Sequence, residues 1–297
     1  MEEILKLDTI SEYNTLVKKE TLHPLVSVHH FENAPPRKLR RIQYGFYTVF
    51  LKQVKCGDLR YGMDAYDYQE GTLIFLAPGQ VIGENKDEMY YPKGSCLLFH
   101  PDLIRGTALD GQMENYHFFS YAISEALHLS EKEKQTVLDC LAKISYELGQ
   151  AIDKHSKQLI VANIRLFLDY CTRFYDRQFI TRDNVHKGIL ERFDKVLNNY
   201  FHSGEVLQKG LPSVAYCAEQ LNLSSNYFGD LVRKETDRSA HDFIHAKVIE
   251  LAKEKLLDLE KPISDIAYEL GFKYPQHFTR LFKQKAGVSP NEYRGMN

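Results

Sequence analysis

The first part of the chain alternates short apolar runs with turn-forming segments. Five runs between residue 22 and about residue 125 are rich in β-branched and aromatic residues, which favour strands: LVSVHHF, YGFYTVFLKQV, TLIFLAPG, CLLFHPDL and NYHFFSYAI. The segments between them, such as ENAPPRK, KCGDLRYG and YYPKGS, contain the Gly, Pro, Asn and Asp residues that turns need. Because no helical period interrupts this spacing, we expect a small antiparallel barrel or sandwich.

The hydrophobic period changes to that of a helix near Ser130. Ser130 is a candidate N-cap with Glu133 three residues later, which is the spacing of a capping box. Apolar residues then recur at steps of three and four along two successive helices. They are Leu138, Leu141, Ile144, Leu148 and Ile152 in the first helix, and Ile160, Ile164, Phe167, Leu168 and Cys171 in the second. These helices could pack on the β-domain, pair with the same helices of a second chain, or do both.

A polar segment, DRQFITRDNVHKG, precedes a C-terminal half that is helical in pattern throughout, and we interpret it as a linker between domains. The C-terminal half contains one pattern twice, first in VAYCAEQLNLSSNYFGDLVRKETDRSAHDF and again in SDIAYELGFKYPQHFTRLFKQKAGVSPNEYR. The matched pairs include Val214 and Ile263, Ala218 and Ala267, Leu221 and Leu270, Phe228 and Phe278, Leu231 and Leu281, and Arg233 and Lys283. A solenoid needs about three copies or more, so two copies predict two similar small units used together.

Each copy has a residue at its centre that tolerates a left-handed backbone: Asn222 in the first and Gly271 in the second. A sharp turn there would start a second helix at a steep angle, with Ala218 or Ala267 allowing the two helices to approach closely. This is the helix-turn-helix arrangement, in which the second helix enters the major groove of DNA.

The apolar residues of each second helix predict its buried face, and the other residues form its outward face. The residues expected to be buried are Phe228, Leu231 and Val232 in the first copy, and Phe278, Leu281 and Phe282 in the second. The candidates for contact with DNA are Ser225, Asn226, Gly229, Asp230 and Arg233, and Tyr274, Gln276, Thr279, Arg280 and Lys283. Gln can read adenine and Arg can read guanine through paired hydrogen bonds, whereas Thr and Lys suit bases or phosphates. One copy alone would fit a solvated helix face, but two copies with the turn residue in register favour DNA.

The segment between the copies, HDFIHAKVIELAKEKLLDLEK, predicts one long helix. Its mostly apolar stripe comprises Phe243, Val248, Leu251, Lys255 and Leu256. A stiff helix would fix the distance between the two recognition helices. Both could then enter successive major grooves, roughly one helical turn apart.

Composition narrows the class of protein without identifying a partner. The chain has 297 residues, of which 43% are hydrophobic and 26% are charged, which is enough for two domains and argues against general disorder. The net charge of −2 neither favours nor excludes nucleic acid. The cysteines include no CxxC pair and fit buried thiols in a reducing cytosol: Cys56, Cys96, Cys140, Cys171 and Cys217. Without a signal-peptide pattern or a run of about eighteen apolar residues, we expect a cytoplasmic protein with no membrane partner.

No pattern in the chain predicts catalysis. His29 and His30 are adjacent in a predicted strand and should point to opposite faces, and no HxH pair precedes a Glu at metal-ligand spacing. Nucleophile-elbow, phosphate-loop and dinucleotide motifs are also missing, so we expect no metal, no cofactor and no enzymatic activity. Candidate polar residues for a ligand cavity are Tyr47, Tyr66, His100, Arg105 and His117, but the ligand-binding residues stay unassigned.

The C-terminal copy reads PISDIAYELGFKYPQHFTRLFKQKAGVSPNEYR and contains HFTRLFK and GVSPNEYR. From Val206 onward the chain resembles the AraC/XylS family of bacterial transcriptional regulators. In the front half, GTLIFLAPGQV and GSCLLFHPDLIRGT resemble, more loosely, the cupin-like sensing domain of many such regulators. The resemblance implies double-stranded DNA as a partner, a small-molecule effector, and a homodimer formed through the helices after the β-domain. It also implies RNA polymerase as a partner if the protein is an activator.

The chain departs from the family pattern in three places. KYP, at residues 273–275, stands where the second recognition helix usually begins with a small capping residue, although Pro275 suits a first helical turn. Asp230 stands where the family often has a cation, and Asp237 where a turn glycine is common, as Gly287 is in the second copy. The first unit is therefore expected to bind more weakly than the second, or to read a different base.

These observations predict an α+β multidomain chain. The expected parts are a cupin-like antiparallel β-barrel that senses an effector (1–130), a helical dimerisation or packing segment (131–177), a linker (178–188), and an all-α domain with two AraC-type helix-turn-helix units (189–297). The expected function is sequence-specific regulation of transcription, with activation favoured by the resemblance alone. Two alternatives stay open: a metal-dependent cupin enzyme with an incidental tail, and a protein-interaction module whose helical tail does not bind DNA.

Overall fold

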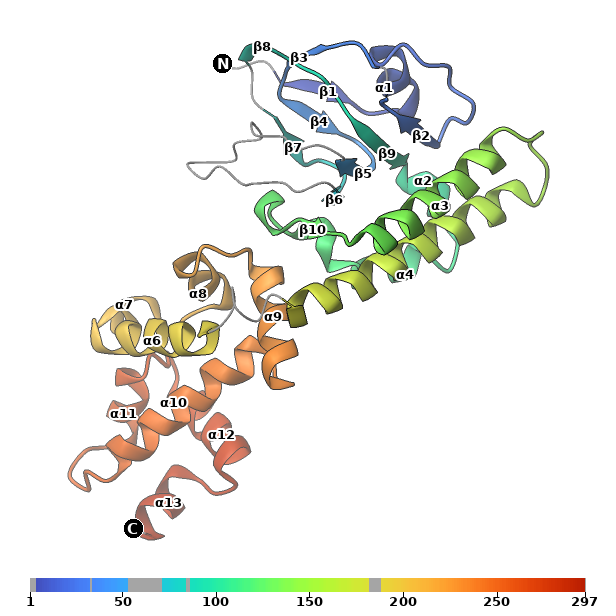
Figure 1. Ribbon diagram of the computed structural model, residues 1–297. Helices are drawn as coiled ribbons and strands as arrows, with labels where there is room; N and C mark the ends of the chain where they lie inside the picture. The colour runs from blue at the N-terminus through green and yellow to red at the C-terminus, as the bar shows by residue number, and fades with distance from the viewer. Residues whose placement is uncertain (1–3, 33, 53–70, 84–85, 182–187, 297) are drawn as a thin grey trace. The chain divides into compact units, whose positions relative to one another are not determined.

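The computed structural model describes residues 4–32, 34–52, 71–83, 86–181 and 188–296. The chain divides into two compact units, Met1–Thr181 and Arg182–Asn297, whose elements are drawn in Figure 1. All described strands belong to the first unit, and the described part of the second unit contains helices and their connections.

The described strands of the N-terminal unit form three sheets. The largest has the order β10-β6-β5-β9-β2 and is antiparallel throughout, and the others are β1-β4-β7 and β3-β8. Four of the five predicted runs contain strands of the largest sheet. The strands are β1 (Leu5–Leu7), β2 (Val26–His30), β3 (Arg37–Leu39), β4 (Ile42–Tyr44), β5 (Tyr47–Lys52), β6 (Thr72–Leu76), β7 (Val81–Ile82), β8 (Lys86–Tyr90), β9 (Gly94–Phe99) and β10 (Leu127–His128).

The described strands do not form the predicted antiparallel barrel. They make three separate sheets rather than one closed sheet, and β1 pairs with β4 in parallel, with Leu5 opposite Ile42. Parallel neighbours are not joined by a tight hairpin turn. The spacing of turn residues therefore could not reveal this pairing, which brings a strand from before residue 22 into the unit.

The prediction of a strand in NYHFFSYAI is wrong. Within this run His117–Ser120 form the 3-10 helix η2, and its last residue, Ile123, begins a second 3-10 helix, η3 (Ile123–Glu125). Neighbouring residues of a strand point to opposite faces, whereas Phe118 and Phe119 are both buried and both approach Phe75 of β6, with ring centroids 4.4 and 5.5 Å apart. Packing two successive rings on one face of the sheet requires a turn. The other short helices of this unit are α1 (Ile10–Leu16), α2 (Pro101–Ile104) and η1 (Asp110–Asn115).

Two long helices, α3 (Glu131–Leu148) and α4 (Ser156–Thr181), follow the sheets and run side by side in Figure 1. The predicted capping box is confirmed, because the Ser130 hydroxyl accepts from the Glu133 backbone N–H and the Glu133 carboxylate accepts from the Ser130 backbone N–H. α3 contacts β2 and α4 contacts β10. The helices therefore pack on the β-rich part of their own chain, which is one of the two roles expected for them.

Most of the predicted apolar face of these helices is buried. In α4 all five predicted residues are buried: Ile160, Ile164, Phe167, Leu168 and Cys171. In α3 Leu141 and Ile144 are buried together with Val137 and Cys140. Ile152 was placed on the same face, but α3 ends before it and its side chain is 70% exposed.

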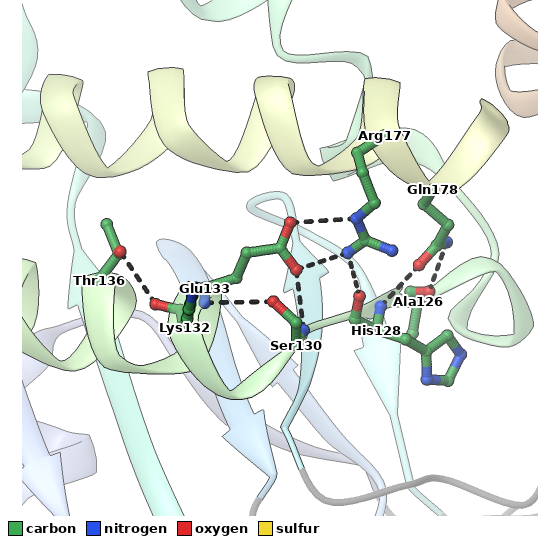
Figure 2. A network of polar contacts seen from close by, with 8 residues as sticks. All are labelled: Ala126, His128, Ser130, Lys132, Glu133, Thr136, Arg177 and Gln178. Atoms are coloured by element: carbon green, nitrogen blue, oxygen red, sulfur yellow. Dashed lines mark hydrogen bonds and ion pairs between the residues drawn. The ribbon is translucent and has the colours of Figure 1, made fainter. Parts of the chain in front are cut away.

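α4 continues beyond residue 178, where the linker was predicted to begin. Figure 2 shows how its last turns are held: the Gln178 side chain accepts from the His128 backbone N–H of β10 at 2.7 Å. The Arg177 guanidinium makes two hydrogen bonds to the Glu133 carboxylate, at 2.7 and 3.0 Å. Gln178 is 1% exposed, so this turn is part of the N-terminal unit rather than a linker. Residues 182–187 of the predicted linker lie outside the described residues.

The C-terminal unit contains two helix-turn-helix units, α8–α9 and α11–α12, joined by the long helix α10, which contacts α9, α11 and α12 (Figure 1). Its helices are α6 (Ile189–His202), α7 (Glu205–Lys209), α8 (Val214–Gln220), α9 (Ser225–Thr236), α10 (Ala240–Leu256), α11 (Ile263–Glu269), α12 (Pro275–Ala286) and α13 (Pro290–Met296).

The buried face of α10 is shifted from the predicted stripe. Val248 and Leu256 are buried as predicted, whereas Phe243 and Leu251 are half-buried. Lys255 is not packed as an apolar residue, because its ammonium group binds the Glu269 carboxylate of α11 at 2.8 Å. The remaining buried positions of the helix are Ala240, Ile244, Ile249 and Ala252.

Each helix-turn-helix unit has its own core along α10. In the first, Phe193 of α6 contacts Phe228 of α9 and Phe243 of α10, with both centroid distances 4.9 Å. The second core is a cluster contributed by α10, α11, α12 and the turn: Val248, Ile249, Ala252, Leu256, Ile266, Ala267, Leu270, Phe272, Phe278 and Phe282. The two recognition helices, α9 and α12, are therefore positioned by different parts of one helix.

Candidate nucleic-acid interface

Both turns contain the predicted left-handed residue. The φ angle is 56° at Asn222 and 88° at Gly271. In each turn a backbone N–H donates back to the buried alanine of the first helix, at 2.9 Å to the Ala218 carbonyl and at 3.0 Å to the Ala267 carbonyl. The two copies of the sequence pattern therefore fold into the same kind of turn.

A side chain does not fit at the second turn without displacing its neighbours. A Cβ atom on Gly271 would lie 2.7 Å from Val206 Cγ2 and 2.9 Å from the Gly210 carbonyl carbon. Val206 belongs to α7, and Gly210 follows that helix directly. The turn that sets the direction of α12 therefore packs against the α7 region at van der Waals distance.

α9 buries the predicted face and exposes most of the candidate residues. Its N-cap is Ser224, whose hydroxyl accepts from the Tyr227 backbone N–H at 3.3 Å. Phe228, Leu231 and Val232 are fully buried as predicted, and Tyr227 is buried with them although the pattern did not place it there. Of the candidates, Ser225, Asn226 and Arg233 are exposed, whereas Gly229 and Asp230 are partly buried.

α12 is arranged in the same way, with one difference at its start. Phe278 and Phe282 are fully buried, Leu281 is half-buried, and Gln276, Arg280 and Lys283 are exposed. The N-cap is Tyr274, which makes no capping hydrogen bond through its side chain and is 47% exposed. α12 therefore begins without a side-chain cap, at the place where the sequence departs from the family pattern. Pro275 occupies the first helical position, where the missing N–H has no intrahelical partner to lose.

Thr279 of α12 is also less available than the sequence implied. The Thr279 hydroxyl donates to the Pro275 carbonyl at 3.1 Å, so its proton is already used within the helix. Its oxygen retains lone pairs that can accept from a base or a bridging water. Lys273 is not among the residues predicted to contact DNA, although it lies next to the start of α12. Its ammonium group is 5.7 Å from the centroid of the Tyr274 ring.

Three candidate cations are available for a ligand. Within the described ranges, the charged groups of Arg233, Arg280 and Lys283 form no ion pair or hydrogen bond with another side chain or with the backbone. A guanidinium can bind guanine O6 and N7 in the major groove, and the Gln276 amide can bind adenine N6 and N7. Ammonium groups and exposed hydroxyls suit phosphate oxygens. The outward faces of α9 and α12 therefore hold the groups that recognition of DNA requires.

The N-terminal unit separates the histidines that were considered as metal ligands. His29 is 5% exposed and hydrogen-bonds Asn14 Oδ1 at 2.8 Å, whereas His30 is exposed and hydrogen-bonds Ser95 Oγ at 2.8 Å. They point to opposite faces, as predicted. His100 caps α2 through Nδ1, which accepts from the next residue but one. Within the described ranges, no three His, Cys, Asp or Glu side chains come together as a metal site.

The candidate polar residues for a ligand cavity are dispersed. Tyr47 stacks on Phe99 with ring centroids 4.9 Å apart, and burial raises the pKa of its hydroxyl. Arg105 is 76% exposed and pairs with Asp102 at 2.8 Å. His117 is exposed in η2, and Tyr66 lies outside the described residues. None of the described helices combines the length and apolar content that crossing a membrane requires.

Comparison with known proteins covers mainly the C-terminal unit. The chain matches a family model described as "Helix-turn-helix domain" over residues 217–296. Regulatory protein SoxS of Escherichia coli (strain K12) is 32% identical over 77 residues, which are 26% of this chain and 72% of SoxS. The uncharacterized HTH-type transcriptional regulator YtdP of Bacillus subtilis (strain 168) is 27% identical over 128 residues, which are 43% of this chain. The match spans only 15% of the length of YtdP.

A solved structure also matches. The C-terminal domain of the two-component response regulator yesN from Fusobacterium nucleatum is 26% identical, with 34% of this chain and 96% of that chain covered at a TM-score of 0.30. The match to SoxS carries the assignment, because it exceeds 30% identity and includes more than two thirds of that protein. With its two helix-turn-helix units joined by α10, the chain belongs to the AraC/XylS family of transcriptional regulators.

Proposed function

We propose that this protein is a cytoplasmic regulator of transcription that binds specific sites in double-stranded DNA and has no enzymatic activity. The observation that carries the proposal is the pair of similar turns, at Asn222 and Gly271, each followed by a helix with a buried apolar face and a polar outward face. α9 and α12 would enter successive segments of the major groove. α10, which packs against both, would set their separation.

The residues proposed to contact DNA are those of the two outward faces. They are Ser225, Asn226, Gly229, Asp230 and Arg233 on α9, and Tyr274, Gln276, Thr279, Arg280 and Lys283 at or on α12. α12 offers two free cations and an amide, whereas α9 offers one free cation and an acid. We therefore expect α9 to bind more weakly than α12 or to read a different base.

The N-terminal unit is proposed to sense a small-molecule effector. This role rests on the family resemblance of the front half, from which a cupin-like fold, activation of transcription and contact with RNA polymerase are also inferred. The proposed domains are residues 1–130 for sensing, 131–181 for packing or dimerisation, and 189–297 for DNA binding. The contact residues of the effector stay unassigned.

Replacing Arg280 by alanine is expected to weaken specific binding by about 1–3 kcal/mol, because a guanidinium that reads a base supplies paired hydrogen bonds. Arg280→Lys should keep the attraction to phosphate but lose the preference for that base. The measurement is competition binding with the native site and with each base of the site exchanged. Lys132→Ala, an exposed cation on α3, is the matched control and should leave binding unchanged. Unchanged affinity and base preference in Arg280→Ala would refute this assignment.

We also propose that the protein is a homodimer in which α4 pairs with its counterpart. Leu159 and Leu166 are 45% and 39% exposed, and their seven-residue spacing places them on one face of α4. Placing Glu at both positions would put charge into an apolar contact, so we expect the dimer to dissociate in sedimentation velocity. Leu22→Glu, at an apolar residue that is 56% exposed elsewhere in the unit, should remain dimeric. A monomeric wild-type chain, or a dimeric double variant, would contradict this interface.

A further inference from the structure

The last turn of α12 is joined to the first turn of α10 by one ion pair. The Lys285 ammonium group lies 2.7 Å from Asp242 Oδ1, across 43 residues of sequence. Lys285 is near the C-terminal end of its helix and Asp242 near the N-terminal end of α10. Each charge is favoured there by the dipole of its own helix. The pair therefore connects two helix ends that are already suited to these charges.

Asp242 is held from two sides. Its Oδ2 atom accepts from the Ser239 hydroxyl at 2.7 Å, while its backbone N–H donates to the Ser239 Oγ at 3.1 Å. Lys285 and the Ser239 hydroxyl, in that order, lower the pKa of this carboxyl to about 2. The carboxylate is therefore charged at any pH at which the protein would bind DNA, and its orientation is fixed by the N-cap of α10.

The ion pair links the first helix-turn-helix unit to the recognition helix of the second. Asp242 precedes Phe243, the residue by which α10 joins the core around Phe193. α12 itself belongs to the second core through Phe278. The start of α12 follows the turn at Gly271, which packs against the α7 region. α12 is thus held at one end by apolar contact and at the other by an ion pair.

We infer that Asp242 is a positioning residue that, through Lys285, fixes the angle between α9 and α12 and so sets the spacing of the two DNA segments that the protein accepts. The inference rests on the proposed function. The Lys285 side chain is 32% exposed and the Asp242 side chain is 44% exposed. An ion pair with this exposure adds little to the stability of a fold. Its effect should therefore appear in the choice of DNA site, where base contacts require both recognition helices in register.

The inference differs from what charge alone predicts. Asp242→Asn removes an acid from a DNA-binding unit, and simple electrostatics then predicts tighter binding to every DNA sequence. A positioning role predicts a loss of discrimination instead. The affinity for sites with one base pair added or removed between the two half-motifs should come closer to the affinity for the native site, because the recognition helices are freer to adjust.

The test uses the full chain and duplexes with native, shortened and lengthened spacing. We expect the ratio of Kd values between altered and native spacing to fall about two- to fivefold in Asp242→Asn and in Lys285→Gln, as loss of an exposed ion pair allows. In the double variant this ratio should fall no further than in either single variant, because each substitution removes the same interaction. Glu254→Gln removes an exposed acid from the same helix and should leave the ratio unchanged.

The outcomes separate this inference from the function on which it rests. A wild-type chain with no preferred site would overturn the proposed function. A wild-type chain with a preferred site, but with an unchanged spacing ratio in both single variants, would overturn only the positioning role. Additive effects in the double variant would do the same, because the two residues would then act independently. Thermal unfolding of each variant close to that of the wild type would confirm that the unit remains folded.

Discussion

Replacing Gly271 by alanine is expected to destabilise the C-terminal unit by about 2–5 kcal/mol. The backbone at this residue has a φ angle of 88°, and a left-handed conformation costs an L-residue about 1–2 kcal/mol. The new methyl group would also lie 2.7 Å from Val206 Cγ2 and 2.9 Å from the Gly210 backbone. Overpacking of this kind costs about 1–3 kcal/mol. The Gly210 atom is backbone, so relief requires α7 or the turn to move.

Gly287→Ala is the matched control for this prediction. Gly287 ends α12 with a φ angle of 82°, and an added Cβ would meet nothing within 4 Å. The substitution should lower the free energy of unfolding only by the cost of the left-handed backbone, about 1–2 kcal/mol. Thermal unfolding of the full chain, followed by circular dichroism, compares the two variants. Equal destabilisation would mean that the packing of the turn against the α7 region contributes nothing.

Acidification from pH 6.5 to pH 4 is expected to destabilise the N-terminal unit by about 3 kcal/mol through His29. Burial, followed by the positive charges of Lys19, Arg37 and His30, lowers the pKa of His29 to about 4. The unfolded chain therefore takes up this proton at a higher pH than the folded chain does. The contribution of neutral His29 to stability is fully present above the pKa that this residue has in the unfolded chain. It is lost as the pH decreases toward the lower pKa that the residue has in the folded chain. Urea unfolding of the full chain across this pH range measures the slope.

Neighbouring histidines of one strand provide the comparison for His29. His29→Gln removes the buried titrating group and should flatten the dependence of the unfolding free energy on pH between 6.5 and 4. His30→Gln alters the next residue of β2, which is exposed on the opposite face, and should change the slope only slightly, because His30 makes the smallest of the contributions that lower the pKa of His29. Equal slopes in both variants would show that protonation of His29 does not govern the acid response.

The helix-turn-helix units could be predicted from the sequence because their determinants are local. The residue type at Asn222 and Gly271 selects the left-handed turn within four residues of the preceding alanine. The period of the apolar residues then assigns the buried faces of α9 and α12 without knowledge of what covers them. Tyr227 was missed because it adjoins a residue of the stripe, and its burial depends on neighbouring helices.

Features that depend on distant parts of the chain could not be predicted. The parallel pairing of β1 with β4 joins residues 5–7 to residues 42–44, and no turn signal connects them. The adjacent rings of Phe118 and Phe119 have strand-like composition, and only the sheet beneath them shows why they form a turn. The ion pair between Asp242 and Lys285 joins α10 to α12 across 43 residues of sequence. Charge patterns along one helix do not contain such information.

The most direct test of the proposed function is to expose the purified full chain to fragments of its own genome at near-physiological salt and to sequence the fragments that it retains. We predict recovery of a few sites that share a two-part motif, with the parts spaced about one helical turn apart. The genes beside those sites would also suggest the class of effector. Uniform retention of fragments, or binding lost after a modest increase in salt, would contradict specific recognition by α9 and α12.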